Sequence, residues 1–299
     1  MRRDILSRRG IALLITVFFI MLITLSVGAG LKYINSASKS MQSEQFILQS
    51  SIILDDVLKL LENPEILPKI ESADDFAIFL GESSFIPFES NGVSVVIEIS
   101  SARDKINPNT LITKPRIDAF KDYLMLKMVN TEYADMLADV VGRIKEDMSY
   151  NTDIFNQKPY LFRDYIASAK HLEELNDSYL KRYRDNSLEN IDMDELFHVS
   201  KDKNSTLDLN YATASSWELM LGCDEGRAEV LSSGAGTYSE PADLGLSETE
   251  KLSLEKFQTS FFEPFVYVKI AISQKDSTAN IMFEYNIELK KGSDFVFEV

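Results

Sequence analysis

The sequence has few of the residues that stabilise small secreted proteins or build common active sites. Its 299 residues contain one cysteine, Cys223, and two histidines, His171 and His198. One cysteine excludes an intramolecular disulfide, and neither histidine lies in a His-Glu-x-x-His pattern. There is no Gly-x-Ser-x-Gly nucleophile elbow, and the Gly-rich residues 233–237 lack the lysine of a phosphate-binding loop. These absences predict a protein that is not an enzyme.

Positive charge is also scarce outside the first ten residues. The chain has 31 Lys and Arg against 47 Asp and Glu, a net charge of −16, while residues 1–10 hold four arginines and one aspartate. A nucleic-acid surface requires clustered Lys and Arg. The composition therefore predicts no nucleic-acid partner. A hydrophobic fraction of 45% is enough to form a core, in one large or two modest domains.

The N-terminal part combines a basic leader with a long uncharged run. Residues 11–31 carry no charge, and about 20 apolar residues suffice for a helix to cross a bilayer. A secretory signal peptide has a shorter apolar region, about 7–15 residues long. Since residues 35–62 contain no Gly or Pro and repeat apolar positions at helical spacing, we expect one helix over residues 11–62. The basic flank predicts a cytoplasmic N-terminus, with the remaining chain across the membrane.

Two stretches flanking the centre of the chain have the alternation of β-strands. Strands are expected at residues 93–99, 265–273, 281–289 and 295–299, with a short helix at 74–80 and a loop at 81–92. These strands would form a small antiparallel sheet with one apolar face, covered by the amphipathic half of the long helix.

The central residues have helical periodicity instead. We therefore predict an α+β fold in which residues 63–101 and 263–299 form the sheet-containing domain and residues 102–262 form an inserted all-α domain. Within the insert, residues 207–232 resemble a helix-hairpin-helix. The turn has a single basic residue, Arg227, which favours helix packing over nucleic-acid binding.

The leader ending in Gly10, the apolar run that starts at Ile11 and its amphipathic continuation resemble type IV pilins and type II secretion pseudopilins. That resemblance implies cleavage by a prepilin peptidase between Gly10 and Ile11, with methylation of the new N-terminus. Most family members carry Glu at the fifth mature position, where this chain has Ile15. Lack of that Glu is typical of the K-type minor pseudopilin, general secretion pathway protein K.

Two motifs resemble the same K-type subclass. Residues 104–111, Asp-Lys-Ile-Asn-Pro-Asn-Thr-Leu, resemble the entry to its inserted domain, and residues 207–215 resemble a segment that leads into a helix. The resemblance implies a pilin-like fold with a long N-terminal helix, anchored in the bacterial inner membrane with most of the chain in the periplasm. It implies a place at the tip of the pseudopilus that supports protein secretion. The implied partners are other minor pseudopilins, the major pseudopilin, the inner-membrane assembly platform and the prepilin peptidase.

One short segment has the spacing of a calcium loop. Oxygen-bearing side chains occupy its positions 1, 3, 5 and 7, which are Asp147, Ser149, Asn151 and Asp153. Thr152 stands where an EF-hand has glycine, and Lys158 stands where it has an acid, so a full EF-hand is excluded. The residues leave two interpretations open, a calcium site and a polar loop. The family resemblance implies calcium in the inserted domain.

Two other functions remain compatible with the sequence. The first is a minor pilin of a type IV or DNA-uptake pilus, which would be expected to have a basic surface. The second is a signal-anchored periplasmic enzyme or binding protein, with the apolar run as an uncleaved anchor. Neighbouring genes for a secretion ATPase and an outer-membrane secretin would separate these alternatives from a pseudopilin.

Overall fold

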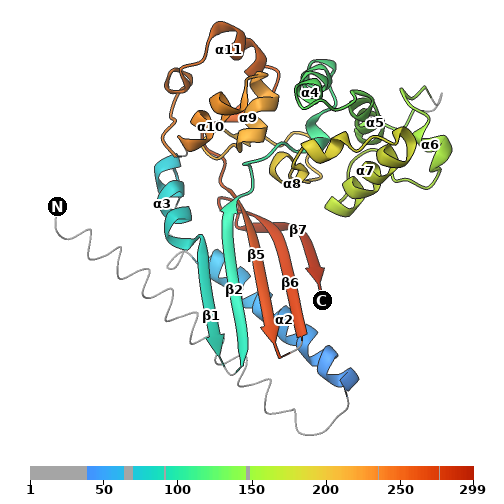
Figure 1. The fold of residues 1–299 in the computed structure, drawn as a ribbon. Coiled ribbons are helices and arrows are strands. Elements are labelled where there is room, and N and C mark those ends of the chain that lie inside the picture. The colour runs from blue at the N-terminus through green and yellow to red at the C-terminus, as the bar shows by residue number, and fades with distance from the viewer. Residues whose placement is uncertain (1–38, 64–69, 91, 146–148, 235, 276) are drawn as a thin grey trace. The chain divides into compact units, whose positions relative to one another are not determined.

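The computed structural model describes residues 39–63, 70–90, 92–145, 149–234, 236–275 and 277–299 (Figure 1). They form two compact units. The first contains the described residues up to Ser101 together with Pro264–Val299, and the second is Ala102–Glu263. The α+β fold class predicted from the sequence is confirmed.

The first unit is built on a five-stranded antiparallel sheet of order β1-β2-β5-β6-β7 (Figure 1). Its strands are β1 (Phe85–Ser90), β2 (Val93–Ser101), β5 (Phe265–Gln274), β6 (Ser277–Asn286) and β7 (Lys291–Glu298). The central pair, β2 and β5, aligns Ile97 with Ile270 and Ile99 with Val268. Alternate residues of these strands are buried, so one face of the sheet is apolar along its length.

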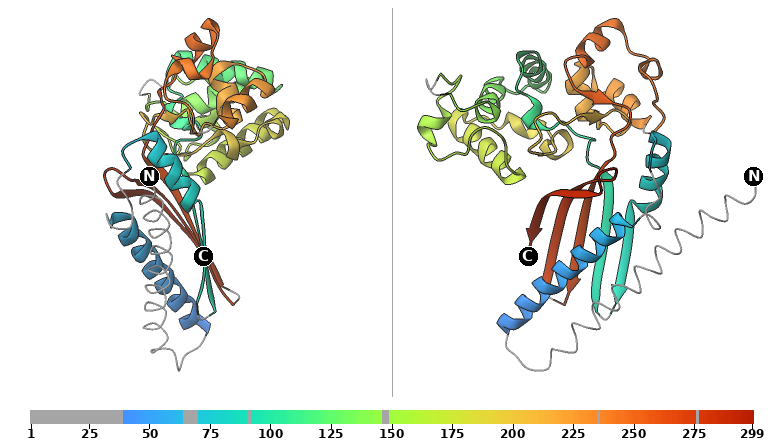
Figure 2. Two further views of the ribbon diagram at one scale, coloured as in Figure 1. Left: turned by 90° about the vertical axis from the view of Figure 1, so that its left-hand side faces the viewer. Right: turned by 180° about the vertical axis from the view of Figure 1, so that it is seen from behind.

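Helix α2 (Lys39–Glu62) covers that apolar face, which Figure 2 shows as a second layer against the sheet. Its buried residues Phe46, Ile53, Val57 and Leu60 recur at helical spacing and are each at most 3% exposed. Burying a side chain of this size stabilises the fold by about 1.5–3 kcal/mol. The end of the helix is held by Lys290, whose Nζ donates to the Glu62 carbonyl at 3.0 Å.

The expected loop at residues 81–92 is wrong. Helix α3 (Ala73–Ser83) extends into this stretch, and β1 pairs antiparallel with β2, with Pro87 opposite Val96. A proline cannot donate to a strand ladder, but an edge strand has one side without a neighbour and tolerates it. The expected strand at 281–289 also ends early, at Asn286, and Leu289 is 71% exposed.

The second unit is mainly helical. Its helices are η1 (Pro108–Thr110), α4 (Lys114–Leu126), α5 (Glu132–Val141), α6 (Ile154–Gln157), α7 (Ala169–Tyr183), η2 (Ser187–Asn190), α8 (Met193–Leu196), α9 (Ala214–Leu221), α10 (Glu225–Ser233), η3 (Pro241–Leu244) and α11 (Glu248–Leu254). Two short parallel strands, β3 (Leu207–Asp208) and β4 (Thr259–Ser260), join distant parts of the unit. The core is rich in aromatic residues, with Trp217, Tyr133 and Tyr179 fully buried. This unit therefore has its own hydrophobic core.

Candidate functional site

The predicted processing residues, Gly10 and Ile11, lie outside the described residues. So do residues 11–38 of the predicted helix over 11–62, including Ile15. Among the helices that the structure does describe, none combines the length and apolarity needed to cross a membrane.

The predicted calcium segment is described only from Ser149 onward, because Asp147 lies outside the described residues. The Ser149 carbonyl accepts a hydrogen bond from Lys145 Nζ at 2.8 Å. Asp153 precedes α6 and forms an ion pair with Arg182 of α7. The other Asp153 carboxylate oxygen accepts from Gln157 Nε2 at 3.1 Å. Thus the Asp153 carboxylate already has a positively charged partner.

A buried carboxylate on α5, Asp139, holds the end of this segment. It is 2% exposed, and its Oδ1 accepts from the backbone N and the side-chain Nδ2 of Asn151 at 2.8 and 3.0 Å. Its Oδ2 accepts from Thr152 N at 2.7 Å and from Thr152 Oγ1 at 2.8 Å. An ionised carboxylate accepts about four hydrogen bonds, so these donors saturate it. Asp139 therefore fastens the segment to α5.

Sequence reasoning missed Asp139 because an acid in an amphipathic helix is usually exposed. The available signal was its position between Met136 and Val140, which are both buried. Across the described part of the chain, no group of three or more His, Cys, Asp or Glu side chains is placed to hold a metal ion. The structure thus brings Asn151 onto Asp139 and Asp153 onto Arg182, while Asp147 lies outside the described residues, so the calcium site stays a prediction.

The motif at residues 104–111 contains two buried asparagines. Asn107 caps η1 by accepting from Asn109 N at 3.1 Å, as expected for an asparagine before a helical turn. Its Nδ2 also reaches the carbonyls of Ser200 and Asp202, at 2.9 and 2.8 Å. The asparagine therefore joins segments more than 90 residues apart in the chain.

Asn109 is fully buried and holds a third segment in place. Its Nδ2 donates to the carbonyls of Ile166 and Ser200 at 2.9 and 2.8 Å, and its Oδ1 accepts from Ile166 N at 2.6 Å. An amide side chain can satisfy a backbone N–H and a carbonyl at once, which neither a carboxylate nor a hydroxyl does with the same geometry. Asn109 is thus the link between the η1 turn and the chain that enters α7.

The motif at residues 207–215 also contains a buried asparagine that joins distant segments. Asn210, 1% exposed, donates from Nδ2 to the carbonyls of Tyr238 and Phe261 at 2.8 and 2.7 Å. Its Oδ1 accepts from Tyr238 N at 2.8 Å. Both motifs are therefore built around asparagines that tie loops together inside the helical unit.

Asp208 of β3 is the most strongly perturbed carboxyl group in this part of the unit. It is fully buried and accepts from Asn210 N at 2.9 Å and from Glu263 N at 3.0 Å. Burial raises the pKa of Asp208 to about 6, and the Glu263 carboxylate acts in the same direction. Burial also raises the pKa of Glu263. Asp208 and Glu263 are therefore two neighbouring carboxyl groups, both with raised pKa values, within the helical unit.

The helix-hairpin-helix resemblance corresponds to α9 and α10. Gly222 ends α9 with a φ of 64°, and Asp224 caps α10 by accepting from Arg227 N at 2.9 Å. The Arg227 guanidinium donates to Glu250 Oε1 at 3.2 Å and to the carbonyls of Leu244 and Gly245. Because these internal acceptors use the guanidinium, Arg227 packs α10 against the η3–α11 segment.

One comparison with known proteins shows a similar fold. No protein-family model and no curated protein sequence matches the chain. Among solved structures, a chain of the GspK-GspI-GspJ complex from the enterotoxigenic Escherichia coli type 2 secretion system has a similar fold. The TM-score is 0.54 at 13% identity, over 87% of this chain and 99% of that chain. The likeness establishes a pseudopilin-like fold.

Proposed function

We propose that this protein is a minor pseudopilin of the K type in a type II secretion system, and that it is not an enzyme. The observation that carries the proposal is a helical unit inserted between β2 and β5 of a sheet covered by α2. The solved chain with a similar fold belongs to a complex of that secretion system. The leader ending in Gly10 and the motifs at 104–111 and 207–215 support the same assignment.

In this function the protein is anchored in the bacterial inner membrane by residues 11–31, with the N-terminus in the cytoplasm and the chain after residue 31 in the periplasm. It occupies the tip of the pseudopilus, primes its assembly and supports the export of folded proteins. Ile15 supports the tip position, because a subunit without the usual Glu cannot pair with the N-terminal amine of a subunit above it. A tip subunit has no subunit above it and needs no such pair. The 102–263 unit also adds bulk that a tip can accommodate more easily than a helical shaft.

We expect the full-length protein to co-purify with other minor pseudopilins in neutral detergent. On α2, Leu48 is 62% exposed and offers an apolar side chain to a neighbouring helix. Leu48→Asp should weaken the complex about tenfold or more, because an unpaired charge would be buried at the contact. Leu48→Met keeps the apolar surface and is the matched control.

Crosslinking of the assembled pseudopilus tests the tip position. Full-length protein in many copies along the shaft, detected by crosslinking, would contradict the tip position.

Cleavage at the leader is the second expected result. In cells with a prepilin peptidase, mass spectrometry should find a methylated N-terminus at Ile11. Gly10→Glu should abolish cleavage, because a charged side chain replaces a residue without a Cβ at the bond to be cut. Ser7→Ala changes the leader away from that bond and should be processed normally. An intact N-terminus at Met1 in the membrane-extracted wild-type protein would exclude this processing.

We propose that residues 147–153 bind calcium, for which the Arg182 guanidinium would compete at Asp153. Since Asp153 pairs with Arg182, a calcium ion would have to replace that cation. We expect millimolar calcium to raise the melting temperature of the full-length protein relative to chelator, and Arg182→Gln to lower the calcium concentration required. Asp147→Ala should remove the shift. An identical melting temperature with calcium and chelator would exclude a site here.

A further inference from the structure

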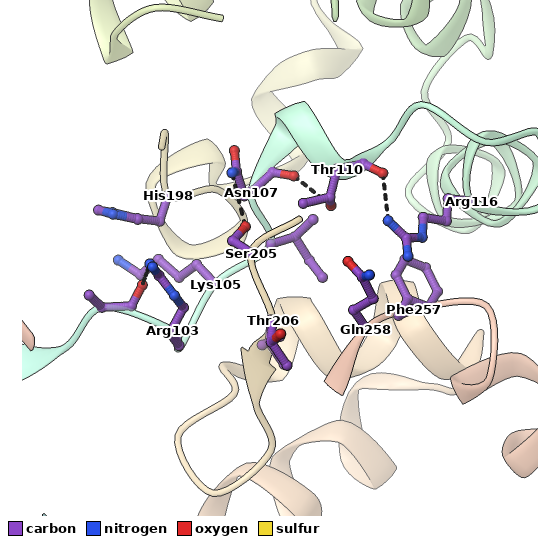
Figure 3. Close-up of a pocket in the computed structure, with 13 residues that line it drawn as sticks. Arg103, Lys105, Asn107, Thr110, Arg116, His198, Ser205, Thr206, Phe257 and Gln258 are labelled. Carbon is purple, nitrogen blue, oxygen red and sulfur yellow. Dashed lines mark hydrogen bonds between the residues drawn. The ribbon is translucent and has the colours of Figure 1, made fainter. Parts of the chain in front are cut away.

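The C-terminal end of α4 exposes three apolar side chains within four residues. Met125 and Leu126 are each 57% exposed, and Met128, just after the helix, is 85% exposed. The helix that carries them is anchored in the unit, because its Arg116 donates to the Thr110 carbonyl at 2.9 Å, as Figure 3 shows. The three apolar side chains are therefore displayed at the end of a helix whose position is fixed.

Met128 is an unusual residue for its backbone position. The helix ends in a Schellman motif, in which Met128 N donates to the Met125 carbonyl at 3.0 Å and Val129 N donates to the Leu124 carbonyl at 2.8 Å. The position of Met128 in this motif is left-handed, with a φ of 59°, and favours glycine because a Cβ is strained there. Stability of the folded chain alone would therefore favour glycine, yet a long apolar side chain stands here in contact with solvent.

The exposed face of α4 beside these side chains is acidic. Asp122 and Asp118 are exposed one and two helical turns before Leu126, so all three lie on one face of the helix. In the described part of the chain, neither acid forms an ion pair. The neighbouring cation, Lys121, pairs with Asp135 at 2.7 Å. The negative charges on this face are thus uncompensated, while the positive charge is not.

The C-terminal side of α4 adds further negative charge. Asn190 Nδ2 donates to the Lys127 carbonyl at 3.0 Å, which places the exposed Glu189 beside the end of the helix. The Lys127 ammonium is occupied by Glu218 at 2.7 Å. A helix C-terminus also carries partial negative charge from its backbone carbonyls. The apolar side chains are therefore bordered by negative potential at the helix end as well.

We propose that Met125, Leu126 and Met128, named here the α4-end surface, dock a basic amphipathic helix of another protein. Such a helix buries its apolar face on a hydrophobic surface, and methionine adapts its shape to different partners. The basic character of the partner follows from charge complementarity, since Asp118 and Asp122 have no cation of their own. The proposal goes beyond the pseudopilin assignment and does not depend on it.

The test uses full-length protein in neutral detergent and photocrosslinking to a synthetic peptide of about 18 residues, or about five helical turns. The peptide consists of Leu and Lys, with the leucines on one helical face and a photoactivatable group among them. One control peptide has the same composition in an order without an apolar face, and another has Glu in place of Lys. We expect saturable crosslinks at residues 125–128 with the Leu/Lys helix, and binding about tenfold weaker or less with either control.

Variants separate binding from stability. Met128→Gly should melt at or above the wild-type temperature, because glycine suits the left-handed position, but should bind the Leu/Lys helix about tenfold more weakly. Asp122→Lys should weaken binding about threefold to tenfold, because it reverses a charge beside the α4-end surface. Leu252→Ser removes an exposed leucine from α11 of the same unit and should leave binding unchanged. The detergent is the same for every variant, so these differences report on the protein.

Three results would overturn the proposal. Crosslinks that map away from the end of α4, or wild-type binding by both Met128→Gly and Asp122→Lys, would exclude the α4-end surface. Equal binding of the Leu/Glu helix would exclude a preference for a basic partner. Equal binding of the peptide without an apolar face would reduce the effect to general attraction between opposite charges.

Discussion

Replacing Asn109 with alanine is expected to lower the free energy of unfolding of the helical unit by about 3–5 kcal/mol, since each buried polar group left unpaired costs about 1–3 kcal/mol. The substitution would leave Ile166 N without its acceptor and the carbonyls of Ile166 and Ser200 without a donor. Asn109 is fully buried, so water cannot replace the lost amide without opening the structure. This loss is a large fraction of the stability of a typical domain, about 5–15 kcal/mol.

Urea unfolding of the full-length protein and amide hydrogen exchange at Ile166 would measure this effect. Asn204→Ala is the matched control, because Asn204 is an exposed asparagine in a loop of the same unit. Asn109→Asp separates size from chemistry. It keeps the shape and the acceptor for Ile166 N, but turns lone pairs toward two carbonyls, so it should also destabilise strongly. If Asn109→Ala unfolds at the same urea concentration as the wild type, the hydrogen bonds of Asn109 do not stabilise the helical unit as we expect.

The second large effect expected is a pH dependence that comes from Asp208. Its pKa is raised from 3.8 to about 6 in the folded protein. The unfolded chain therefore ionises this group more readily than the folded chain does. The group destabilises the fold above pH 6, and that penalty disappears as the pH falls toward 4. A difference of this size corresponds to at most about 3 kcal/mol.

Asp208→Asn removes the titrating group and isolates its contribution. Asp104 and Glu263 also have raised pKa values. The dependence of wild-type stability on pH would therefore combine the effects of several groups that all destabilise the fold at high pH. The difference in stability between Asp208→Asn and wild type should shift in favour of the variant between pH 4 and pH 7. Asp243→Asn provides a control of opposite sign, because backbone hydrogen bonds lower the Asp243 pKa. Parallel stability curves for Asp208→Asn and wild type would refute the expectation.

The sequence was most informative where one interaction dominates. Alternating apolar residues identified β2, β5 and β6, because one face of each strand lies in the core. The helical spacing of Phe46, Ile53 and Val57 identified the face of α2 that covers the sheet. These patterns reflect burial, which depends on local periodicity.

The sequence was less informative where structure depends on distant partners. β1 contains Pro87 and was assigned to a loop, although pairing with β2 makes it a strand. Asparagine favours helix caps and loops by residue type alone, so a local role of this kind for the motif asparagines can be predicted. Their contacts across more than 50 residues depend on how the loops meet, which no local pattern encodes.

The order of the strands has a consequence for synthesis. β2 and β5 are paired neighbours, with Ser101 opposite Val266, yet the 162 residues of Ala102–Glu263 separate them in the chain. As the chain emerges, β1 and β2 are synthesised before β5, so β2 has no second neighbour until the whole helical unit has been made. Closing so long an unfolded loop would cost about 3 kcal/mol more than closing a four-residue turn, by the logarithmic dependence on loop length. A helical unit that folds before β5 arrives brings its own ends together and removes most of that entropic cost.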